Sequence, residues 1–352
     1  AYGEAMSTTE LLEAARALGQ SLAPEAGRVE REGVERATLD RLAAAGLYGL
    51  TGPAWAGGGD VPASVYRKVA EWLSGADGNT WLVWFQHHPV VKMLAASPNT
   101  DLAGRYLPGL CAGTLQAGVA FSHLRNPSPS VTATAEGDRW RFSGTQPWCT
   151  GWGLIDLVLV GAATDEEVLF ALVPAEDGPA VRCAGELSLA AMAGTRTVAL
   201  ALDGLVVEPA DLVLRAPRHD WAVADHARSA NVQPSVFGIA LAALSSLRQT
   251  GAAVAGPLGE ALHDVRARAY RLADEEPTGP GAGVDERLET AAEAILLGVE
   301  VTSALVTSLG GKAMVLSHPA QRWAREAMFH LVFAQTGALR SATLAAVAGA
   351  RG

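Results

Sequence analysis

The spacing of hydrophobic residues changes twice along the chain and divides it into three regions. From residue 7 to residue 110, apolar residues recur every three or four positions, which is typical of amphipathic helices. Helices are predicted over residues 11–18, 39–47, 65–73 and 80–94. Glycine-rich segments separate these stretches, and glycine interrupts helices. The first region is therefore predicted to be a helical domain.

The second region, residues 114–215, consists of short apolar runs bounded by turn residues. Strands are predicted over residues 131–134, 140–142, 157–160, 168–173 and 198–202. A segment of roughly a hundred residues with several short strands is typical of a small β-barrel or β-sandwich.

The third region, residues 222–348, returns to a helical pattern rich in Ala and Leu. Long helices are predicted over residues 239–247, 258–272, 284–309 and 319–347. Four helices with short connections indicate a bundle. The fold class is therefore predicted to be α+β. We expect an N-terminal α-helical domain (residues 6–112), a middle β domain (113–218) and a C-terminal four-helix bundle (219–350).

Composition narrows the possible partners and locations. A hydrophobic content of 49% over 352 residues supports a large core, and a net charge of -10 argues against a nucleic-acid partner. Three cysteines without a CxxC pair, and no signal-peptide pattern, predict a cytoplasmic protein. Residues 229–247 carry no charge but include Asn231, Gln233 and Pro234, so a buried helix is predicted there and not a membrane span.

The segment from residue 308 to residue 340 holds the most informative motif. It contains Leu309-Gly310-Gly311, Pro319, Arg322, Arg325-Glu326-Ala327, Phe333 and Thr336. This pattern resembles the C-terminal end of acyl-CoA dehydrogenases, and the order of the three regions is similar to that superfamily over essentially the whole chain. The match places Ala334 where the family has its catalytic glutamate. Because a methyl group cannot take a proton, the resemblance implies the family scaffold without its usual base.

Two further segments resemble the strands that hold the flavin in this family. One contains Phe121 and Ser122, and the other contains Trp148 and Thr150. The resemblance implies that Ser122 donates to the pyrimidine edge of the flavin, where negative charge develops on reduction. It implies that Trp148 forms a flat apolar wall and that Thr150 presents a hydroxyl near N5 of the ring.

The resemblance is weaker at the distal half of the cofactor. Gly310, Gly311 and Thr336 match positions where the family backbone approaches the FAD of a neighbouring subunit. In the family, an arginine meets the diphosphate across a dimer interface and a phenylalanine packs on the cofactor; here they are replaced by Gly251 and Val254. The loss of a charged phosphate contact makes FMN an alternative to the expected FAD.

The acyl-CoA loop of the family is also altered. The loop from His123 to Ser130 is short and contains no glycine. Arg125 could meet a phosphate, although a solvated loop arginine is the commoner case. Asp225 and His226 could substitute for the missing base, although a solvated helix start is the simpler interpretation.

Three histidines are the candidate catalytic residues. His330 precedes Ala334 by four residues, so in a continuous helix the two would share one face. His87 and His88 lie within the helix predicted over residues 80–94, in a segment that resembles the end of the α domain in flavin monooxygenases of the same fold, and His330 matches a histidine of their C-terminal segment. An imidazole titrates near neutrality and suits acid–base work. The alternative for each is a structural histidine. No metal-ligand spacing is present, since adjacent His87 and His88 point about a hundred degrees apart on a helix.

Together these patterns predict a flavin-dependent oxidoreductase that oxidises or monooxygenates a small or carrier-bound substrate. One alternative is an acyl-thioester dehydrogenase with a relocated base, and another is a flavin-binding or scaffold protein without turnover. A flavin reductase or electron-transfer partner and a homodimer or homotetramer are expected.

Overall fold

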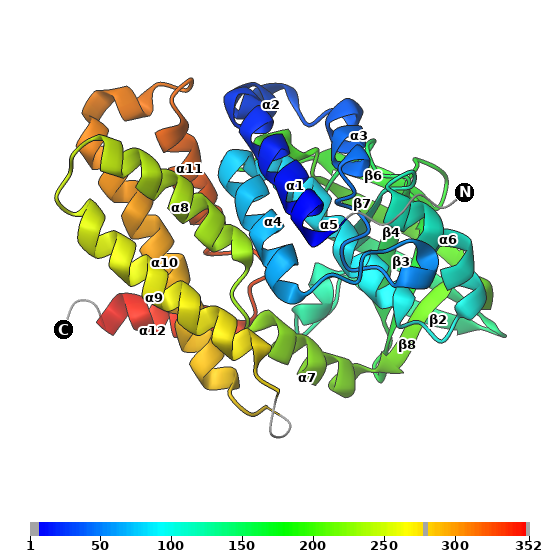
Figure 1. Cartoon of the computed structure of the whole chain (residues 1–352). Coiled ribbons are helices and arrows are strands. Elements are labelled where there is room, and N and C mark those ends of the chain that lie inside the picture. Colours follow the sequence, from blue (N-terminus) through cyan, green and yellow to red (C-terminus); the bar gives the residue numbers. More distant parts are fainter. Residues whose placement is uncertain (1–6, 277–280, 350–352) are drawn as a thin grey trace.

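The computed structural model describes residues 7–276 and 281–349, in which helices from both ends of the chain lie next to one sheet (Figure 1). The predicted domain limits at residues 6 and 350 lie outside the described residues. The N-terminal helices are α1 (Thr8–Leu22), α2 (Ala26–Glu32), α3 (Arg36–Ala44), α4 (Ala63–Ala76), α5 (Gly78–Ala95) and α6 (Thr100–Ala112). All four helices predicted for this region are confirmed.

A single residue, Asp77, separates α4 from α5 and starts the second helix. Its carboxylate accepts hydrogen bonds from the backbone N–H groups of Asn79 (3.1 Å) and Thr80 (3.3 Å). These groups have no partner within the helix, so the cap stabilises the first turn. The chain changes direction here without a loop, and α5 leads into the centre of the molecule.

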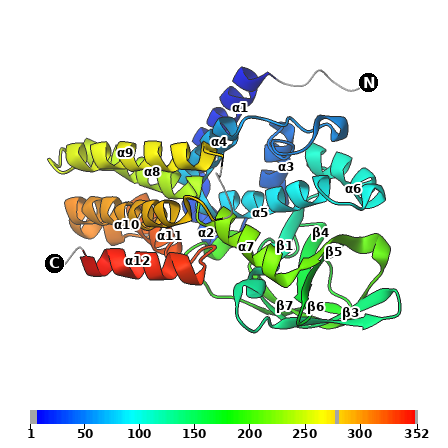
Figure 2. The same ribbon diagram turned by 90° about the horizontal axis from the view of Figure 1, so that it is seen from below.

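The middle region forms an eight-stranded sheet beneath α5 and α6 (Figure 2). Its strands are β1 (Ala117–Ala120), β2 (Val131–Glu136), β3 (Arg139–Cys149), β4 (Leu157–Ala163), β5 (Glu167–Pro174), β6 (Val181–Glu186), β7 (Val198–Val207) and β8 (Leu212–Pro217). The order is β6-β7-β3-β2-β4-β5-β8, and β1 pairs in parallel with β4. The five predicted strands are confirmed. The prediction missed β6 and β8, which lie at the two ends of this order, and most residues of β6 are exposed.

The C-terminal region contains α7 (Arg218–Ser229), α8 (Pro234–Gln249), α9 (Ala255–Asp274), α10 (Val284–Leu309), α11 (Pro319–Phe329) and α12 (Gly337–Gly349). The single helix predicted over residues 319–347 is wrong. The chain leaves the helix after Phe329 and turns through Ala334, whose φ is 52°. Aromatic packing of this turn against α5 outweighs the helical pattern of the sequence, and Thr336 starts α12 by accepting a hydrogen bond from the Leu339 N–H (3.2 Å).

The bundle lies beside the N-terminal helices, and α7 connects it to the sheet (Figure 2). By length and composition, residues 218–249 and 284–314 form helical stretches that could cross a membrane. In the fold, however, α8 buries ten of its sixteen residues between its neighbours. The apolar run at residues 229–247 is thus explained by burial in the protein.

A buried charged cluster joins the start of α5 to α11. Arg322 donates to the Glu326 carboxylate (2.8 Å) and to the carbonyl of Ala76 (3.2 Å), and Asp77 lies near enough to raise the pKa of Glu326 further. Within the described residues the second carboxylate oxygen of Glu326 has no hydrogen-bond partner. Burial raises the pKa of Glu326 from 4.5 to about 7. The positive charge of Arg322 therefore acts on two buried carboxyl groups, those of Glu326 and Asp77.

We expect this cluster to make stability fall as pH rises. Between pH 4.5 and about 7 the folded protein holds a proton on Glu326 that the unfolded chain has released. The free energy of unfolding should therefore drop by roughly 1–3 kcal/mol from pH 5 to pH 8 through this residue. Glu326→Gln keeps the acceptor for Arg322 but cannot titrate, so its drop should be smaller. Urea denaturation of both proteins at the two pH values measures the difference. An equal drop in both would contradict the assignment.

Candidate functional site

The first part of the site lies where β1 and β3 end side by side. Phe121 and Ser122 follow β1, and Ser122 begins a short 3-10 helix (Ser122–Arg125). Trp148 lies near the end of β3, where the register with β7 shifts between residues 146 and 149. This irregularity leaves Trp148 50% exposed, and Ser122 is exposed as well. The strand ends therefore present a half-exposed aromatic ring and an exposed hydroxyl.

A buried polar group beside these strand ends lacks a partner. Gln146 is fully buried and its amide N–H donates to the carbonyl of Ala120. Its carbonyl oxygen has no hydrogen-bond partner among the described residues. An unpaired buried acceptor is costly in a protein, so this oxygen lowers the stability of the structure at the end of β1 and β3.

Thr150 lies just beyond β3 and is 5% exposed. Its hydroxyl is 3.0 Å from that of Thr197, which precedes β7. The pairing of Cys149 with Val198 in the sheet brings these two threonines together. Sequence analysis missed Thr197, because only the strand register shows that it neighbours Thr150.

Two residues of the loop after β1, His123 and Arg125, are structural. His123 donates from Nε2 to the carbonyl of Gly161 (3.0 Å) and accepts at Nδ1 from the Ser130 N–H (3.0 Å). Arg125 was expected to be solvated, and Asp225 to lie at a solvated helix start. Instead, Arg125 donates two hydrogen bonds to Asp225 (2.7 and 3.0 Å) in the middle of α7. A paired, largely buried Asp225 is poorly placed to act as a free base.

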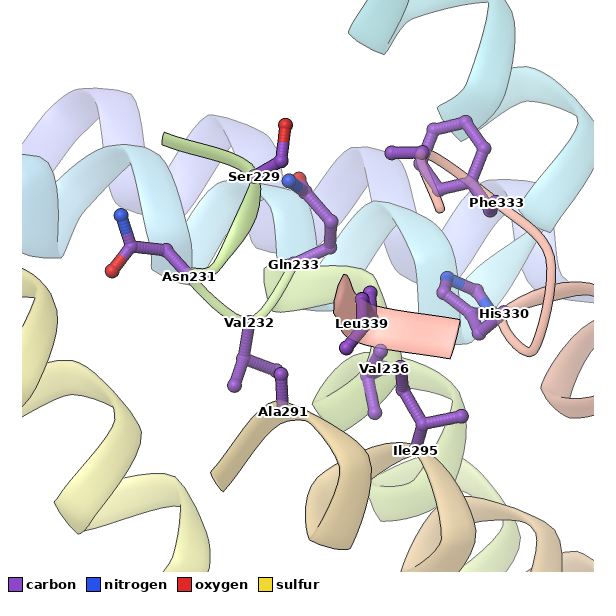
Figure 3. A pocket seen from close by; sticks show the side chains of 11 residues that line it. Ser229, Asn231, Val232, Gln233, Val236, Ala291, Ile295, His330, Phe333 and Leu339 are labelled. Atoms are coloured by element: carbon purple, nitrogen blue, oxygen red, sulfur yellow. The ribbon is translucent and has the colours of Figure 1, made fainter. Parts of the chain in front are cut away.

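The second part of the site is a small cavity beside Ala334. It has a volume of about 20 Å³, enough for one water molecule. Its lining comes from the α7–α8 connection, α8, α10, the turn after α11 and α12 (Figure 3). The residues are Ser229, Asn231, Val232, Gln233, Val236, Ala291, Ile295, His330, Phe333, Ala334 and Leu339. None of these is a carboxylate, and the side-chain oxygen of Asn231 is buried without a partner among the described residues.

His330 lines this cavity, but both of its ring nitrogens already have partners. The carbonyl of Glu326 lies 2.8 Å from Nδ1 and can only accept, so Nδ1 carries the proton. In the neutral ring Nε2 then accepts from the hydroxyl of Ser235, 2.7 Å away. Burial lowers the pKa of His330 to about 4, so the ring is neutral at pH 7. The expected common helical face of His330 and Ala334 is wrong, because the helix ends at Phe329.

His87 and His88 lie on α5 in separate surroundings. His87 donates from Nε2 to the Leu110 carbonyl (3.2 Å) and accepts at Nδ1 from the Ala117 N–H (3.2 Å). Burial lowers its pKa to about 3. Among the described residues, His88 has a hydrogen-bond contact only with the hydroxyl of Thr51 (3.2 Å from Nδ1), and its buried Nε2 has no partner. Neither ring shares a hydrogen-bond partner with His330, so the geometry favours structural roles for both.

The predicted residues of the distal cofactor half lie on the outside of the bundle. Gly310 and Gly311 are exposed at the end of α10, and Gly251 has a φ of 74° in the connection before α9. Val254 is 44% exposed. No hydrogen bond or ring contact connects these residues to Trp148 or Ser122 within the described chain. In one protomer, therefore, the two predicted halves of a cofactor site are not joined. Among the described residues, no group of three His, Cys, Asp or Glu side chains could hold a metal ion.

Comparison with known proteins agrees with this architecture. A family model described as the N-terminal domain of acyl-CoA dehydrogenase matches residues 7–114. Butyryl-CoA dehydrogenase from Megasphaera elsdenii is 18% identical, with a TM-score of 0.79 and 97% of each chain covered. The FMN-bound dibenzothiophene monooxygenase TdsC from Paenibacillus sp. A11-2 is 20% identical, with a TM-score of 0.78 and coverage of 91% of this chain and 92% of that one. Nitroalkane oxidase is 16% identical, with a TM-score of 0.81 and coverage of 96% and 95%. The predicted α+β fold is confirmed.

We expect the Ser235–His330 hydrogen bond to contribute to stability. Ser235→Ala removes the only donor to the Nε2 atom of a buried histidine and should lower the free energy of unfolding by about 1–3 kcal/mol. Ser303→Ala, on the exposed side of α10, is the matched control and should change it by less than about 0.5 kcal/mol. Chemical denaturation compares the two. Equal stability of both variants would show that the bond has no structural role.

Proposed function

We propose that this member of the acyl-CoA dehydrogenase superfamily is a flavin-dependent oxidoreductase that oxidises or monooxygenates a small or carrier-bound substrate. The observation that carries the proposal is the cavity beside Ala334, whose lining includes no carboxylate. Abstraction of a proton next to a thioester carbonyl needs a base, and this cavity offers only a neutral histidine. Relatives by fold include a dehydrogenase, a monooxygenase and an oxidase.

The residues at the end of β1 and β3 fit the ring of a flavin. Trp148 offers a half-exposed aromatic wall and Ser122 an exposed hydroxyl. Flat aromatic surface and a few convergent polar groups are what ring recognition requires. Phe121, half-buried at the same edge, adds apolar surface.

The distal half of the cofactor has no comparable support within one protomer. The protein has Gly251 and Val254 where the resemblance expects an arginine and a phenylalanine, and Gly310 and Gly311 face outward. We therefore propose FAD as the cofactor only if a second subunit completes its site, and FMN as the alternative. The hydroxyl of Thr336 already accepts a hydrogen bond from the first turn of α12.

A bound flavin supplies a reversible two-electron carrier, and the chain supplies binding, orientation and exclusion of water. Trp148 would pack against the ring of a bound flavin, and Ser122 and Thr150 would supply polar groups beside it. Phe333 packs against Phe85 of α5 and is half-buried at the cavity, so it can limit access of water to the reacting atoms. His330 holds its Nδ1 proton on the Glu326 carbonyl. It can therefore act on a substrate only through Nε2, if the Ser235 hydroxyl turns away.

A dehydrogenase with a relocated base is the weaker candidate. Asp225 is held by Arg125, and Glu326 is fully buried against Arg322 and does not line the cavity. His226 lies on α7, and no contact places it at the cavity. A flavin-binding or scaffold protein without turnover is the third candidate, and reduction of the bound flavin by a substrate would distinguish an enzyme from it.

The proposed partners follow from the chemistry and from the surface. An oxidoreductase of this kind needs a flavin reductase or an electron-transfer protein to complete its cycle. Met314, Val315 and Leu316 are 55–65% exposed directly after Gly310 and Gly311. Such an apolar strip is typical of an interface, and we propose that a second copy of the chain covers it in a homodimer or homotetramer in the cytoplasm.

We expect Trp148 to be needed for flavin binding. Trp148→Ala removes an aromatic wall of roughly 150–250 Å² and should weaken the affinity for FAD or FMN about tenfold or more. Trp55→Ala is the matched control, because Trp55 is 59% exposed in a different part of the chain. Titration of apoprotein with each flavin, followed by fluorescence, measures both variants. Equal affinities in the unmutated protein and the Trp148 variant would show that the site is elsewhere.

We expect ordinary saturated acyl-CoA esters not to reduce the bound flavin at a useful rate. The position of the expected base is Ala334, and a general base contributes roughly 10²–10⁴-fold. Ala334→Glu should gain slow reduction by butyryl-CoA if the pocket admits a thioester. Ala334→Gln has the same size without a base and should not gain it. Anaerobic bleaching of the flavin absorbance is the measurement. Rapid bleaching in the unmutated protein would favour the dehydrogenase with a relocated base.

A further inference from the structure

Three buried threonines form a chain of hydroxyl groups behind the candidate ring site. The hydroxyl of Thr150 is 3.0 Å from that of Thr197, which is 2.7 Å from that of Thr195. The hydroxyl of Thr195 is 2.7 Å from the carbonyl oxygen of Met192, and the row of hydroxyl groups ends there. The three threonines are 5%, 7% and 0% exposed. The row is thus closed to water at its inner end.

The direction of the protons along this row follows from counting them. Each hydroxyl has one proton, and the row contains three contacts, so each contact uses one proton. The carbonyl of Met192 can only accept, and it therefore takes the proton of Thr195. Thr195 must then accept from Thr197, and Thr197 must accept from Thr150. No other arrangement satisfies all three contacts.

We propose that Thr195 and Thr197 act as positioning residues that make Thr150 a hydrogen-bond acceptor toward the flavin, and that the site thereby favours reduced flavin. The inference rests on the proposed function, since it needs a flavin at Thr150. With its proton directed inward, Thr150 presents only lone pairs to a ligand. The N5 atom of oxidised flavin is an acceptor and finds no donor there, whereas N5–H of reduced flavin is a donor and is satisfied.

The backbone around the row is strained in the way that functional segments often are. Thr195 ends a 3-10 turn (Ala193–Thr195) that is flanked by Met192 and Arg196, with φ values of 58° and 49°. Such conformations cost about 1–3 kcal/mol each and persist only where the surroundings impose them. The Asn79 side chain fixes the turn by accepting from the Gly194 N–H (2.9 Å). A methyl group on Gly194 would lie 2.1 Å from the Val29 carbonyl oxygen.

Further contacts hold Thr150 itself at this turn. The N–H of Gly151, the next residue, donates to the carbonyl of Thr195 (3.0 Å). If the Thr150 hydroxyl donated its proton to oxidised flavin, only two protons would remain for the three contacts of the row. One of these hydrogen bonds would then be lost. The loss of one hydrogen bond corresponds to roughly a threefold to tenfold change in binding. We expect that factor as the contribution of the row to the preference for reduced flavin.

The test compares the affinities of apoprotein for oxidised and reduced FMN or FAD, measured under anaerobic conditions, and the midpoint potential of the bound flavin. Thr197→Val interrupts the row and frees the Thr150 proton to point outward. It should strengthen binding of oxidised flavin, weaken binding of reduced flavin and lower the midpoint potential by up to about 30 mV, the equivalent of a tenfold change for two electrons. Thr197→Ser restores the hydroxyl and should restore the potential.

A second variant also frees the Thr150 proton, and it keeps the proposal testable if the first variant does not fold. Thr195→Val removes the inner acceptor, so Thr197 can donate to Thr150 and the potential should fall as well. An unchanged or raised potential in folded Thr197→Val and Thr195→Val, with flavin bound, overturns this inference alone. If the unmutated protein binds neither oxidised nor reduced flavin, the proposed function fails, and this inference fails with it.

Discussion

The fold depends on the close contact between α4 and α8, which joins the N-terminal helices to the bundle. A methyl group at Gly75 would lie 2.7 Å from the carbonyl oxygen of Gly238, and one at Gly238 would lie 2.2 Å from the hydroxyl of Ser74. Only glycine allows the two helices to approach this closely. Glu71, buried one turn earlier on α4, accepts from Arg266 (2.5 and 2.9 Å) and from the Tyr270 hydroxyl (2.6 Å) of α9. The charge is fully paired, so the contact can be both tight and polar.

This contact fixes α5, which forms a wall shared by both parts of the site. Because Asp77 alone separates α4 from α5, the position of α4 sets the direction of the next helix. On one side of α5, the side chain of Val83 lies close to Gly151. A methyl group added to Gly151 would be 3.3 Å from it. On the other side, Trp81 packs against His330 and Phe333, with ring centroids 5.9 and 5.8 Å apart. A shift of the α4–α8 contact would therefore move the strand end and the cavity relative to each other.

The interior of the site is polar but nearly free of charge. His123 and His330 each donate one hydrogen bond and accept another, and burial lowers the pKa of both. Asp225 has its charge paired with Arg125. Neutral groups with fixed proton positions select a ligand by donor and acceptor pattern, whereas free carboxylates would supply proton transfer. The described residues that line the cavity include no carboxylate for such a transfer.

The sequence alone determined the order of the three regions, four of the N-terminal helices, five of the strands and the absence of a glutamate at position 334, because these depend on local periodicity and motif register. It could not show that the helix predicted over residues 319–347 breaks, since packing of Phe333 against α5 is a contact between distant segments. The same limit applies to the pairing of Arg125 with Asp225 and of Thr150 with Thr197. Tertiary structure decided whether each candidate polar group is free or engaged, because hydrogen-bond partners are set by distance in space and not by separation along the chain.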